Sequence, residues 1–506
     1  MRDHGIGSWT ARRARKTPHR LAVVHQDTRH TYAQLYDRTT ALAHHLRALG
    51  VRRGDRVAFL GPNHPAFLET LFAAGRLGAI FVPLNTRLAE PELAHCLTDS
   101  GSTVLVHTAS FARFAERSGV PGLLTVGEPY ENALAEADRS PVDERVTLDD
   151  LATIMYTSGT TGRAKGAALT HGNLVWNSVN TLVDGDFTAD EVTLLSAPLF
   201  HTAALNMTCL PTLLKGGTLV LEESFSPSRT LDLIEEHRVT MLFGVPAMFG
   251  RMAEEERFAT ADLSSVRTMM CGGAPVPRAL IQTYEARGLS FIQGYGMTEA
   301  SPGVCLLDAE NALAKAGSAG VPHFFNDIRI VDPTGDDTER GELIAEGPTI
   351  MAGGYWGLPG ATADALLNGW FRTGDVAVAD ADGYVTIVDR VKDVIISGGE
   401  NIYPAEVEKA LYEHPDVVDC AVIGVPDQRW GEVGRAVVVL REGADTDEDS
   451  VLAALDGRLA RYKIPKSVVF VGELPRSGAG KLLKLPIRRT YGAKDPHPQH
   501  THGEGS

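Results

Sequence analysis

One stretch of the sequence carries the residue types that are needed to wrap a polyphosphate. Residues 156–166 read Tyr-Thr-Ser-Gly-Thr-Thr-Gly-Arg-Ala-Lys-Gly. The glycines allow sharp turns that expose backbone N–H groups, the hydroxyls add donors, and Arg163 and Lys165 add positive charge. The common P-loop requires Gly-Lys-Ser/Thr, whereas Lys165 stands between Ala164 and Gly166. The stretch is therefore either a phosphate-binding loop of another kind or a plain surface turn.

Further along the chain, single residues add chemistry of a matching kind. Glu299 follows an expected strand, and one carboxylate beside phosphates is suited to Mg²⁺. Asp375 follows a tight turn and has two oxygens for the hydroxyls of a ribose, and Arg390 could reach the same sugar or a phosphate. Lys481 ends the glycine-rich stretch 475–481. Each of them also fits a plain surface role, so only their combination indicates a nucleotide site.

The composition limits the class of protein. The chain has 506 residues and a net charge of −16, so no basic surplus indicates nucleic-acid binding. Its five cysteines are scattered and form no CxxC pair, which favours a reduced, cytoplasmic protein without a structural zinc site. No apolar run reaches the length of a membrane span, and no apolar stretch follows the basic residues near the N-terminus, as a secretory signal would require.

The elements expected around these residues alternate between strand and helix. Residues 21–107 and again 218–296 carry short apolar runs separated by amphipathic stretches, which predicts two packed, mostly parallel α/β sheets with a cleft. Residues 127–150 are acidic and without a clear period, so we expect a linker there. Short runs between glycine turns in 328–388 predict a small antiparallel sheet or distorted barrel, and 405–471 predicts a separate α+β domain.

Taken together and in this order, the motifs resemble those of the adenylate-forming superfamily, which includes acyl-CoA synthetases, luciferases and the adenylation domains of peptide synthetases. The resemblance covers about residues 8–490 and rests on the 156–166 loop, Gly272–Pro275, Tyr295–Glu299, Phe371–Asp375, Asp389–Lys392, Ser397–Pro404 and Gly480–Lys481. It implies an α/β protein with a large N-terminal domain of two packed sheets plus a small distorted β-barrel, and a small mobile α+β C-terminal domain. The implied parts are the AMP-binding domain (1–389), the hinge (390–392) and the mobile domain (393–490). Residues 491–506 hold proline, glycine and three histidines, and from this composition we expect a disordered tail rather than a metal site.

The resemblance also implies an activity, that of an AMP-forming acid–thiol ligase close to the fatty-acyl-CoA synthetases. ATP and Mg²⁺ would convert a carboxylate to an acyl-adenylate and pyrophosphate, and the thiol of coenzyme A would then displace AMP. The matching catalytic positions are Lys481 beside the α-phosphate, Glu299 at the magnesium ion, His201 at the pocket mouth and Lys392 at the hinge. The implied nucleotide-binding positions are Thr157, Ser158, Gly159, Thr160, Thr161, Gly162, Lys165, Gly273, Ala274, Pro275, Gly294, Tyr295, Gly296, Met297, Thr298, Asp375 and Arg390, with Gly398 and Gly399 beside the pantetheine arm of coenzyme A.

The expected acid pocket is lined by mostly apolar or small residues, namely Phe200, Ala203, Met207, Phe243, Val245, Gly272 and Val304. No acidic residue at 200–203 could hold an α-amino group, and His201 is the one cation candidate for a second carboxylate. Amino acids and dicarboxylates are therefore disfavoured. We expect a medium- or long-chain fatty acid first, and an aryl or hydroxycinnamate-type acid as the alternative.

Coenzyme A is the expected acceptor because the chain lacks the insertion that is typical of fatty-acyl-AMP ligases. An acyl carrier protein or another nucleophile stays open as the acceptor, and so does a homodimer. A luciferase-like oxygenase is disfavoured. So is a non-catalytic nucleotide-binding protein, because Glu299 and Lys481 are both present.

Overall fold

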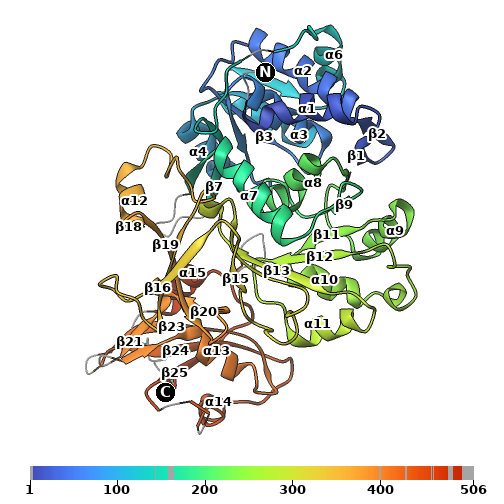
Figure 1. Ribbon diagram of the computed structural model, residues 1–506. Helices are drawn as coiled ribbons and strands as arrows, with labels where there is room; N and C mark the ends of the chain where they lie inside the picture. Colours follow the sequence, from blue (N-terminus) through green and yellow to red (C-terminus); the bar gives the residue numbers. More distant parts are fainter. Residues whose placement is uncertain are drawn as a thin grey trace, which may run out of the picture. The chain divides into compact units, whose positions relative to one another are not determined.

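The chain divides into two compact units, within each of which the residues contact one another more than they contact the other unit. Figure 1 labels the helices and strands of both. In this computed structural model the described residues are 4–142, 144–157, 164–397, 400–427, 430–456, 458–459, 461–476 and 482–492. The first unit comprises Met1–Arg329, Ile344–Thr373 and Ala379–Thr386, and the second comprises Ile330–Leu343, Gly374–Val378 and Ile387–Ser506. The expected boundary at residue 389, the hinge at 390–392 and the mobility of the C-terminal domain stay predictions. The expected disordered tail lies, from residue 493 on, outside the described residues.

The first unit contains a six-stranded sheet with the order β6-β5-β3-β4-β7-β8. Its strands are β3 (Arg56–Leu60), β4 (Ile80–Pro83), β5 (Ser102–His107), β6 (Gly122–Thr125), β7 (Leu151–Thr157) and β8 (Lys165–Thr170). Neighbouring strands are parallel except β7 and β8, which form an antiparallel hairpin. The same part of the chain forms helices α1 (Trp9–Lys16), α2 (Tyr32–Ala48), α3 (Pro65–Arg76), α4 (Glu90–Ser100) and α5 (Ala112–Arg117). Local signals set their starts: Thr31 and Gln34 form a capping box before α2, and Pro65 opens α3.

A nine-stranded sheet with the order β15-β14-β13-β12-β11-β9-β10-β1-β2 completes this framework. Its strands are β1 (Leu21–His25), β2 (Thr28–Thr31), β9 (Val192–Leu195), β10 (Thr218–Leu221), β11 (Met241–Gly244), β12 (Thr268–Gly272), β13 (Phe291–Gly296), β14 (Gly303–Leu307) and β15 (Val321–Pro322). The run from β1 to β13 is parallel, and the outer strands β2, β14 and β15 are antiparallel. The chain between and beside these strands forms helices α7 (His171–Asp184), α8 (Leu210–Lys215), α9 (Pro227–His237), α10 (Pro246–Ala253) and α11 (Arg278–Glu285), while α12 (Pro359–Asp364) contacts β18 (Leu366–Leu367) in a smaller sheet. The predicted α/β class with two large, mostly parallel sheets is confirmed.

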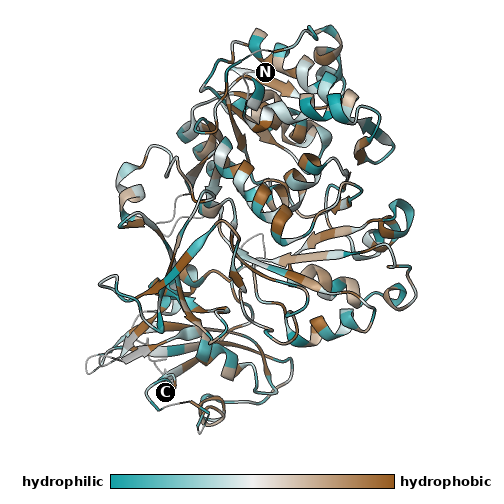
Figure 2. Ribbon diagram, in the orientation of Figure 1, coloured by the Kyte–Doolittle hydropathy of each residue, from teal (hydrophilic) through white to brown (hydrophobic). Residues whose placement is uncertain are grey.

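The two sheets share one apolar core. Val57 of β3 and Leu219 of β10 belong to the same buried cluster, whereas their chain neighbours Ala58 and Val220 belong to two other clusters. Because successive side chains of a strand point to opposite faces, one face of each sheet meets the shared core and the other face packs under helices. In Figure 2, helix α9 carries both hydrophobic and hydrophilic residues, as expected for a helix that covers a sheet on one side and meets solvent on the other.

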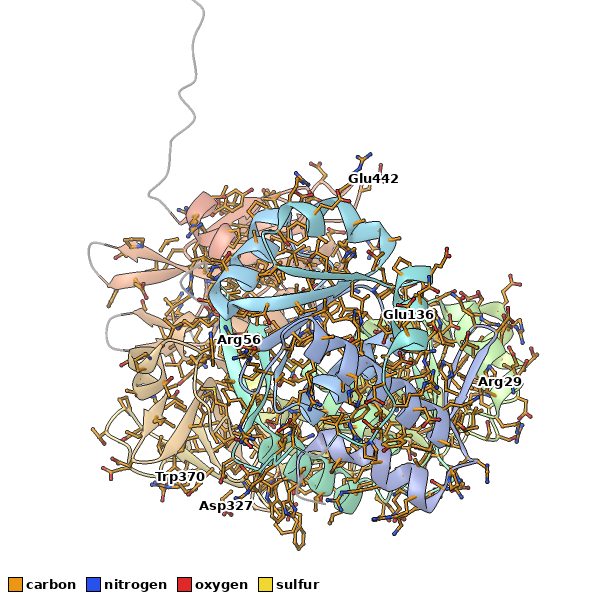
Figure 3. The ribbon with its side chains drawn as sticks, turned by 90° about the horizontal axis from the view of Figure 1, so that it is seen from above. Arg29, Arg56, Glu136, Asp327, Trp370 and Glu442 are labelled. Atoms are coloured by element: carbon orange, nitrogen blue, oxygen red, sulfur yellow. The ribbon has the colours of Figure 1, made fainter. Side chains whose placement is uncertain are left out.

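Helix α6 (Glu128–Glu136) occupies part of the stretch that the sequence analysis assigned to a linker, and that assignment is wrong there. Tyr130 and Leu134 are one helical turn apart and both are buried. The Tyr130 hydroxyl also donates to Glu69 at 2.6 Å. Two apolar anchors on an otherwise polar helix leave little periodicity to detect in the sequence. Glu136, at the end of α6, is labelled in Figure 3.

Two smaller sheets follow. Strands β16 (Asp327–Val331), β17 (Arg340–Glu346), β18 (Leu366–Leu367), β19 (Trp370–Ala379) and β20 (Val385–Arg390) form a five-stranded sheet, and the division between the units runs through its strands. The second unit adds a five-stranded sheet of β21 (Ile395–Ser397), β22 (Glu400–Ile402), β23 (Val417–Asp427), β24 (Gly431–Leu440) and β25 (Ser467–Phe470), with helices α13 (Pro404–Leu411), α14 (Glu448–Ala453) and α15 (Lys484–Tyr491). Within the described ranges, no helix combines the length and apolar content that crossing a bilayer requires.

Truncation of a side chain in the shared core should destabilise the first unit. Leu219 is fully buried, so Leu219→Ala should lower the free energy of unfolding by about 2–5 kcal/mol. Leu123 of β6 is 38% exposed, and Leu123→Ala serves as the matched control with an expected loss well below that of Leu219→Ala. Chemical denaturation of both variants measures the difference. Equal losses would contradict a core shared between the sheets.

Candidate active site

The expected phosphate loop connects the two strands of the β7–β8 hairpin. Thr157 pairs with Lys165 across the hairpin, and the Thr157 hydroxyl donates to the Lys165 carbonyl at 3.4 Å. The expected positions Ser158, Gly159, Thr160, Thr161 and Gly162 lie outside the described residues. Lys165 begins β8, and its Nζ lies 5.2 Å from the centre of the Tyr355 ring. The lysine is thereby held at the base of the loop.

Glycines stand at the carboxyl ends of neighbouring parallel strands, which is where ligands bind in α/β sheets. Gly272 at the end of β12 pairs with Gly294 of β13, and a Cβ at Gly272 would meet the Gly294 carbonyl at 3.1 Å. At Gly296 a Cβ would come within 1.7 Å of the Pro302 carbonyl, so this position requires glycine. The residues predicted to bind nucleotide after these strands are exposed (Gly273, Ala274, Pro275 and Gly296) or half-buried (Tyr295, Met297 and Thr298).

Glu299 lies in a short 3-10 turn, Thr298–Ala300, directly after β13. Its Oε1 accepts a hydrogen bond from the Tyr355 hydroxyl at 2.8 Å, and its carbonyl accepts one from Met351 N at 2.7 Å. No cationic side chain of the described residues pairs with the carboxylate, which leaves its second oxygen for another ligand.

The donor chemistry at Glu299 fits magnesium. Within the described part of the chain, no group of three or more His, Cys, Asp and Glu residues could hold a metal ion. Mg²⁺ is typically held by one or two carboxylates together with substrate phosphates.

Four of the predicted pocket residues border the core between the two large sheets. Met207 and Phe243 belong to this cluster, and Phe200 and Ala203 pack against it. The Met207 methyl group would lie 4.0 Å from a Cβ at Gly294. The pocket residues and the strand that carries the glycines therefore adjoin.

The other three predicted pocket residues, Val245, Gly272 and Val304, lie outside the shared core. Gly272 and Val245 follow at the ends of β12 and β11, where Val245 Cγ1 would lie 3.6 Å from a Cβ at Gly273. Val304 packs in a separate small cluster with Ala300 and Ala345. The pocket role of these residues stays a prediction.

His201 is held in its neutral form. Burial, together with the nearby positive charge of Arg87, lowers the pKa of His201 from 6.5 to about 4. Its ring lies 4.7 Å from the Phe200 ring in a tilted arrangement. A neutral imidazole carries no positive charge for a second carboxylate on the acid, and the expectation that dicarboxylates are disfavoured stays a prediction.

In the second unit, Asp375 and Arg390 lie together. Arg390 Nε is 2.6 Å from Asp375 Oδ1, and the Asp375 side chain is 5% exposed. Asp375 follows Gly374, whose φ of +70° lies in the left-handed region that glycine adopts readily. The structure therefore brings together the two residues that were predicted to reach one ribose, and the ribose contact itself stays a prediction.

Lys392 lies in the short turn Val391–Asp393 at the expected hinge. Arg488 donates to the Lys392 carbonyl at 3.2 Å and pairs with the Asp393 carboxylate at 3.1 Å. On the other side of the turn, Asp389 accepts a hydrogen bond from Ala405 N at 3.0 Å. Gly398, Gly399 and Lys481 lie outside the described residues.

The sequence analysis did not single out Tyr355 or Asn206, although Asn206 stands between the predicted pocket residues Ala203 and Met207. Tyr355 contacts both Glu299 and Lys165, although it lies 56 residues from Glu299. Asn206 lies in a π-helix (Ala203–Cys209), is fully buried, and has no partner for its side-chain amide among the described residues. π-Helical turns often occur at functional sites, but no residue pattern signals them.

Comparisons with known proteins place this geometry in context. The family model described as AMP-binding enzyme matches residues 10–356, and the AMP-binding enzyme C-terminal domain matches residues 406–481. A feruloyl-CoA synthase from Amycolatopsis sp is 57% identical over 497 residues, which are 97% of this chain and 100% of that relative.

Two solved structures resemble the whole chain. A Mycobacterium tuberculosis fatty acyl CoA synthetase has a TM-score of 0.81 at 38% identity, with 97% of this chain and 99% of that one covered. An O-succinylbenzoate coenzyme A synthetase from Bacillus subtilis, in complex with ATP and magnesium ion, has a TM-score of 0.86 at 34% identity, with 95% and 99% covered.

The depressed pKa of His201 predicts how a variant responds to pH. Since His201 stays neutral above about pH 5, His201→Asn should lower kcat/KM by the same factor at pH 6 and at pH 8. In the folded protein the pKa lies below its unfolded value, so wild-type stability should fall, relative to the variant, as pH drops from 6.5 towards about 4. Activity profiles and thermal melts of both proteins measure these effects. A factor that changes between pH 6 and 8 would show that His201 transfers a proton or acts as a cation.

Proposed function

The chain belongs to the AMP-binding enzyme family, that is, to the adenylate-forming superfamily, and we propose that it is a hydroxycinnamate–CoA ligase acting on ferulate or a closely similar acid. Its general activity is that of an AMP-forming acyl-CoA synthetase, with ATP, Mg²⁺ and coenzyme A as co-substrates. The proposal that the acid is ferulate or a closely similar one rests on the 57% identity to a feruloyl-CoA synthase along 97% of the chain.

The reaction proceeds in two half-reactions. A carboxylate oxygen of the acid attacks the α-phosphorus of ATP, the bond to the β-phosphate oxygen breaks, and pyrophosphate leaves. The thiol of coenzyme A then attacks the acyl carbon, loses its proton and displaces AMP. Mg²⁺, when bound with ATP, neutralises phosphate charge in the first half-reaction.

We assign the residues of the site to these half-reactions as follows. Lys165 steadies the β- and γ-phosphates, and Glu299 holds the magnesium ion. Asp375 and Arg390 bind the ribose. Lys481 bridges the carboxylate and the α-phosphate during adenylation, and a swing of the C-terminal domain at Lys392 then admits the thiol. The contacts that support these roles are the Lys165–Tyr355–Glu299 cluster and the Asp375–Arg390 ion pair.

We base the proposed acid on the similarity to known relatives rather than on the apolar lining of the pocket alone. The sequence analysis put a medium- or long-chain fatty acid first and a hydroxycinnamate-type acid second. The comparisons favour the second, because identity to the feruloyl-CoA synthase is 57% and identity to the fatty acyl CoA synthetase is 38%. The aromatic side chains Phe200 and Phe243 suit a flat ring as well as an alkyl chain.

Asn206 supplies a polar group that an alkyl chain would leave unpaired. Its amide is fully buried and, within the described residues, has no hydrogen-bond partner. Leaving a buried polar group unpaired costs about 1–3 kcal/mol, so a partner is expected in the working enzyme. The phenolic hydroxyl of ferulate would be such a partner. We therefore place Asn206 at the polar end of the acid pocket.

Coenzyme A remains the proposed acceptor, in agreement with the activities named for the relatives above. Transfer to an acyl carrier protein would need the same first half-reaction. Measurement of the product with and without coenzyme A separates the two acceptors.

Three acids test the substrate proposal: ferulate, 3-methoxycinnamate, which lacks the 4-hydroxyl group, and decanoate. Wild-type kcat/KM for acyl-CoA formation should be highest for ferulate, with a preference of about ten- to a hundredfold over 3-methoxycinnamate if the hydroxyl satisfies a buried polar group. Asn206→Leu should narrow that preference, and Asn132→Leu, on the exposed face of α6, should not. A kcat/KM for decanoate equal to that for ferulate would contradict the proposed substrate, and an unchanged preference in Asn206→Leu would contradict the role of Asn206.

A further inference from the structure

Residues 351–356 connect two parts of the first unit that are assigned to the phosphates. Met351 N donates to the Glu299 carbonyl at 2.7 Å, at one end of the segment. At the other end, Trp356 N donates to the Gly166 carbonyl at 2.7 Å, within strand β8. The backbone of this segment therefore ties the Glu299 turn to the base of the phosphate loop.

Tyr355 adds a side-chain link between the same two parts. Its hydroxyl donates to Glu299 Oε1 at 2.8 Å, and Lys165 Nζ lies 5.2 Å from the centre of its ring. Hydrogen bonds to a carboxylate are stronger than neutral ones, and an ammonium group within about 6 Å of a ring face is attracted to the ring. One side chain thus contacts both the acid and the cation of this part of the site.

The orientation of the Glu299 carboxylate depends on this contact. No other described side chain donates a hydrogen bond to it, and the terminal torsion of a glutamate side chain has only a broad preference, so this one donor sets how the carboxylate is turned.

Tyr355 is itself fixed by its surroundings. Its N–H donates to Thr362 Oγ1 at 2.9 Å. The next residue, Trp356, donates from Nε1 to the Asp99 carbonyl at 3.1 Å, and the Arg56 guanidinium lies 5.7 Å from the Trp356 ring centre. Arg56 is labelled in Figure 3. The phenol is therefore presented from a held backbone rather than from a free loop.

We propose that Tyr355 is a positioning residue for the magnesium-bound nucleotide, whose hydroxyl orients the Glu299 carboxylate for the ion and whose ring orients Lys165 for the phosphates. This inference rests on the proposed function, in which Glu299 holds magnesium. Removal of the hydroxyl alone frees the carboxylate and keeps the ring beside Lys165. Removal of the ring frees both groups.

The variants Tyr355→Phe and Tyr355→Leu separate these two effects in the full-length enzyme. Tyr412→Phe is the matched control, because the Tyr412 hydroxyl also donates to a carboxylate, that of Asp419 at 2.7 Å, in the second unit. Three quantities are measured for each: the Mg²⁺ concentration that gives the half-maximal rate, the calorimetric affinity for ATP with and without Mg²⁺, and the melting temperature.

Tyr355→Phe should raise the half-maximal Mg²⁺ concentration about ten- to a hundredfold, as loss of a hydrogen bond behind a metal ligand typically does. Its kcat should recover at saturating Mg²⁺, and its affinity for ATP without Mg²⁺ should match wild type. Tyr355→Leu should also weaken binding of metal-free ATP, because Lys165 loses its ring contact. Tyr412→Phe should match wild type throughout.

A wild-type Mg²⁺ dependence in Tyr355→Phe would overturn the inference. So would an equal loss of rate at every Mg²⁺ concentration together with a lowered melting temperature, since that pattern indicates a purely structural role. Glu299→Gln, measured in parallel, separates this inference from the function on which it rests. If Glu299→Gln shifts the Mg²⁺ dependence and Tyr355→Phe does not, the inference alone fails. If Glu299→Gln shifts nothing, the magnesium role of Glu299 fails and the inference fails with it.

Discussion

A carboxylate and a triphosphate repel each other, and an enzyme that joins them must offset this repulsion before a bond can form. Two unit charges about 4 Å apart repel by roughly 1 kcal/mol in water and by more where the dielectric constant is lower. Lys165 places a cation at the base of the expected phosphate loop, and Glu299 presents a carboxylate suited to a counter-ion.

The carboxyl ends of the parallel strands provide the place where these charges can be brought together. Parallel strands β11, β12 and β13 finish side by side, and Gly272, Gly294 and Gly296 keep those ends free of side chains. Both large sheets pack on one core, so the hairpin that carries Lys165 and the strand that precedes Glu299 belong to one packed unit. Segment 351–356 then bonds to both, which makes their spacing a property of the fold rather than of a flexible loop.

Much of this architecture could be predicted from the sequence, because strand and helix periods are local. The alternation in 21–107 and 218–296 placed the sheets. Residue types alone made loop 156–166 and Glu299 candidates for a phosphate site, and their roles stay predictions. Helix α6 was missed because Tyr130 and Leu134 are its only buried side chains. Tyr355 was missed because its partners, Glu299 and Lys165, are distant in the sequence and no local pattern marks the contact. The apolar lining put a fatty acid first, whereas the 57% identity to a feruloyl-CoA synthase favours the hydroxycinnamate alternative. The burial of the Asn206 amide, on which the proposed pocket also rests, cannot be read from the sequence.

The central claim is that the carboxylate of ferulate is activated as an adenylate before any thiol takes part. Exchange of labelled pyrophosphate into ATP, measured with ferulate and Mg²⁺ and without coenzyme A, tests it most directly. The account predicts exchange that requires both ferulate and Mg²⁺ and proceeds in the absence of the thiol. Exchange that is indifferent to ferulate, or that begins only when coenzyme A is added, would contradict it.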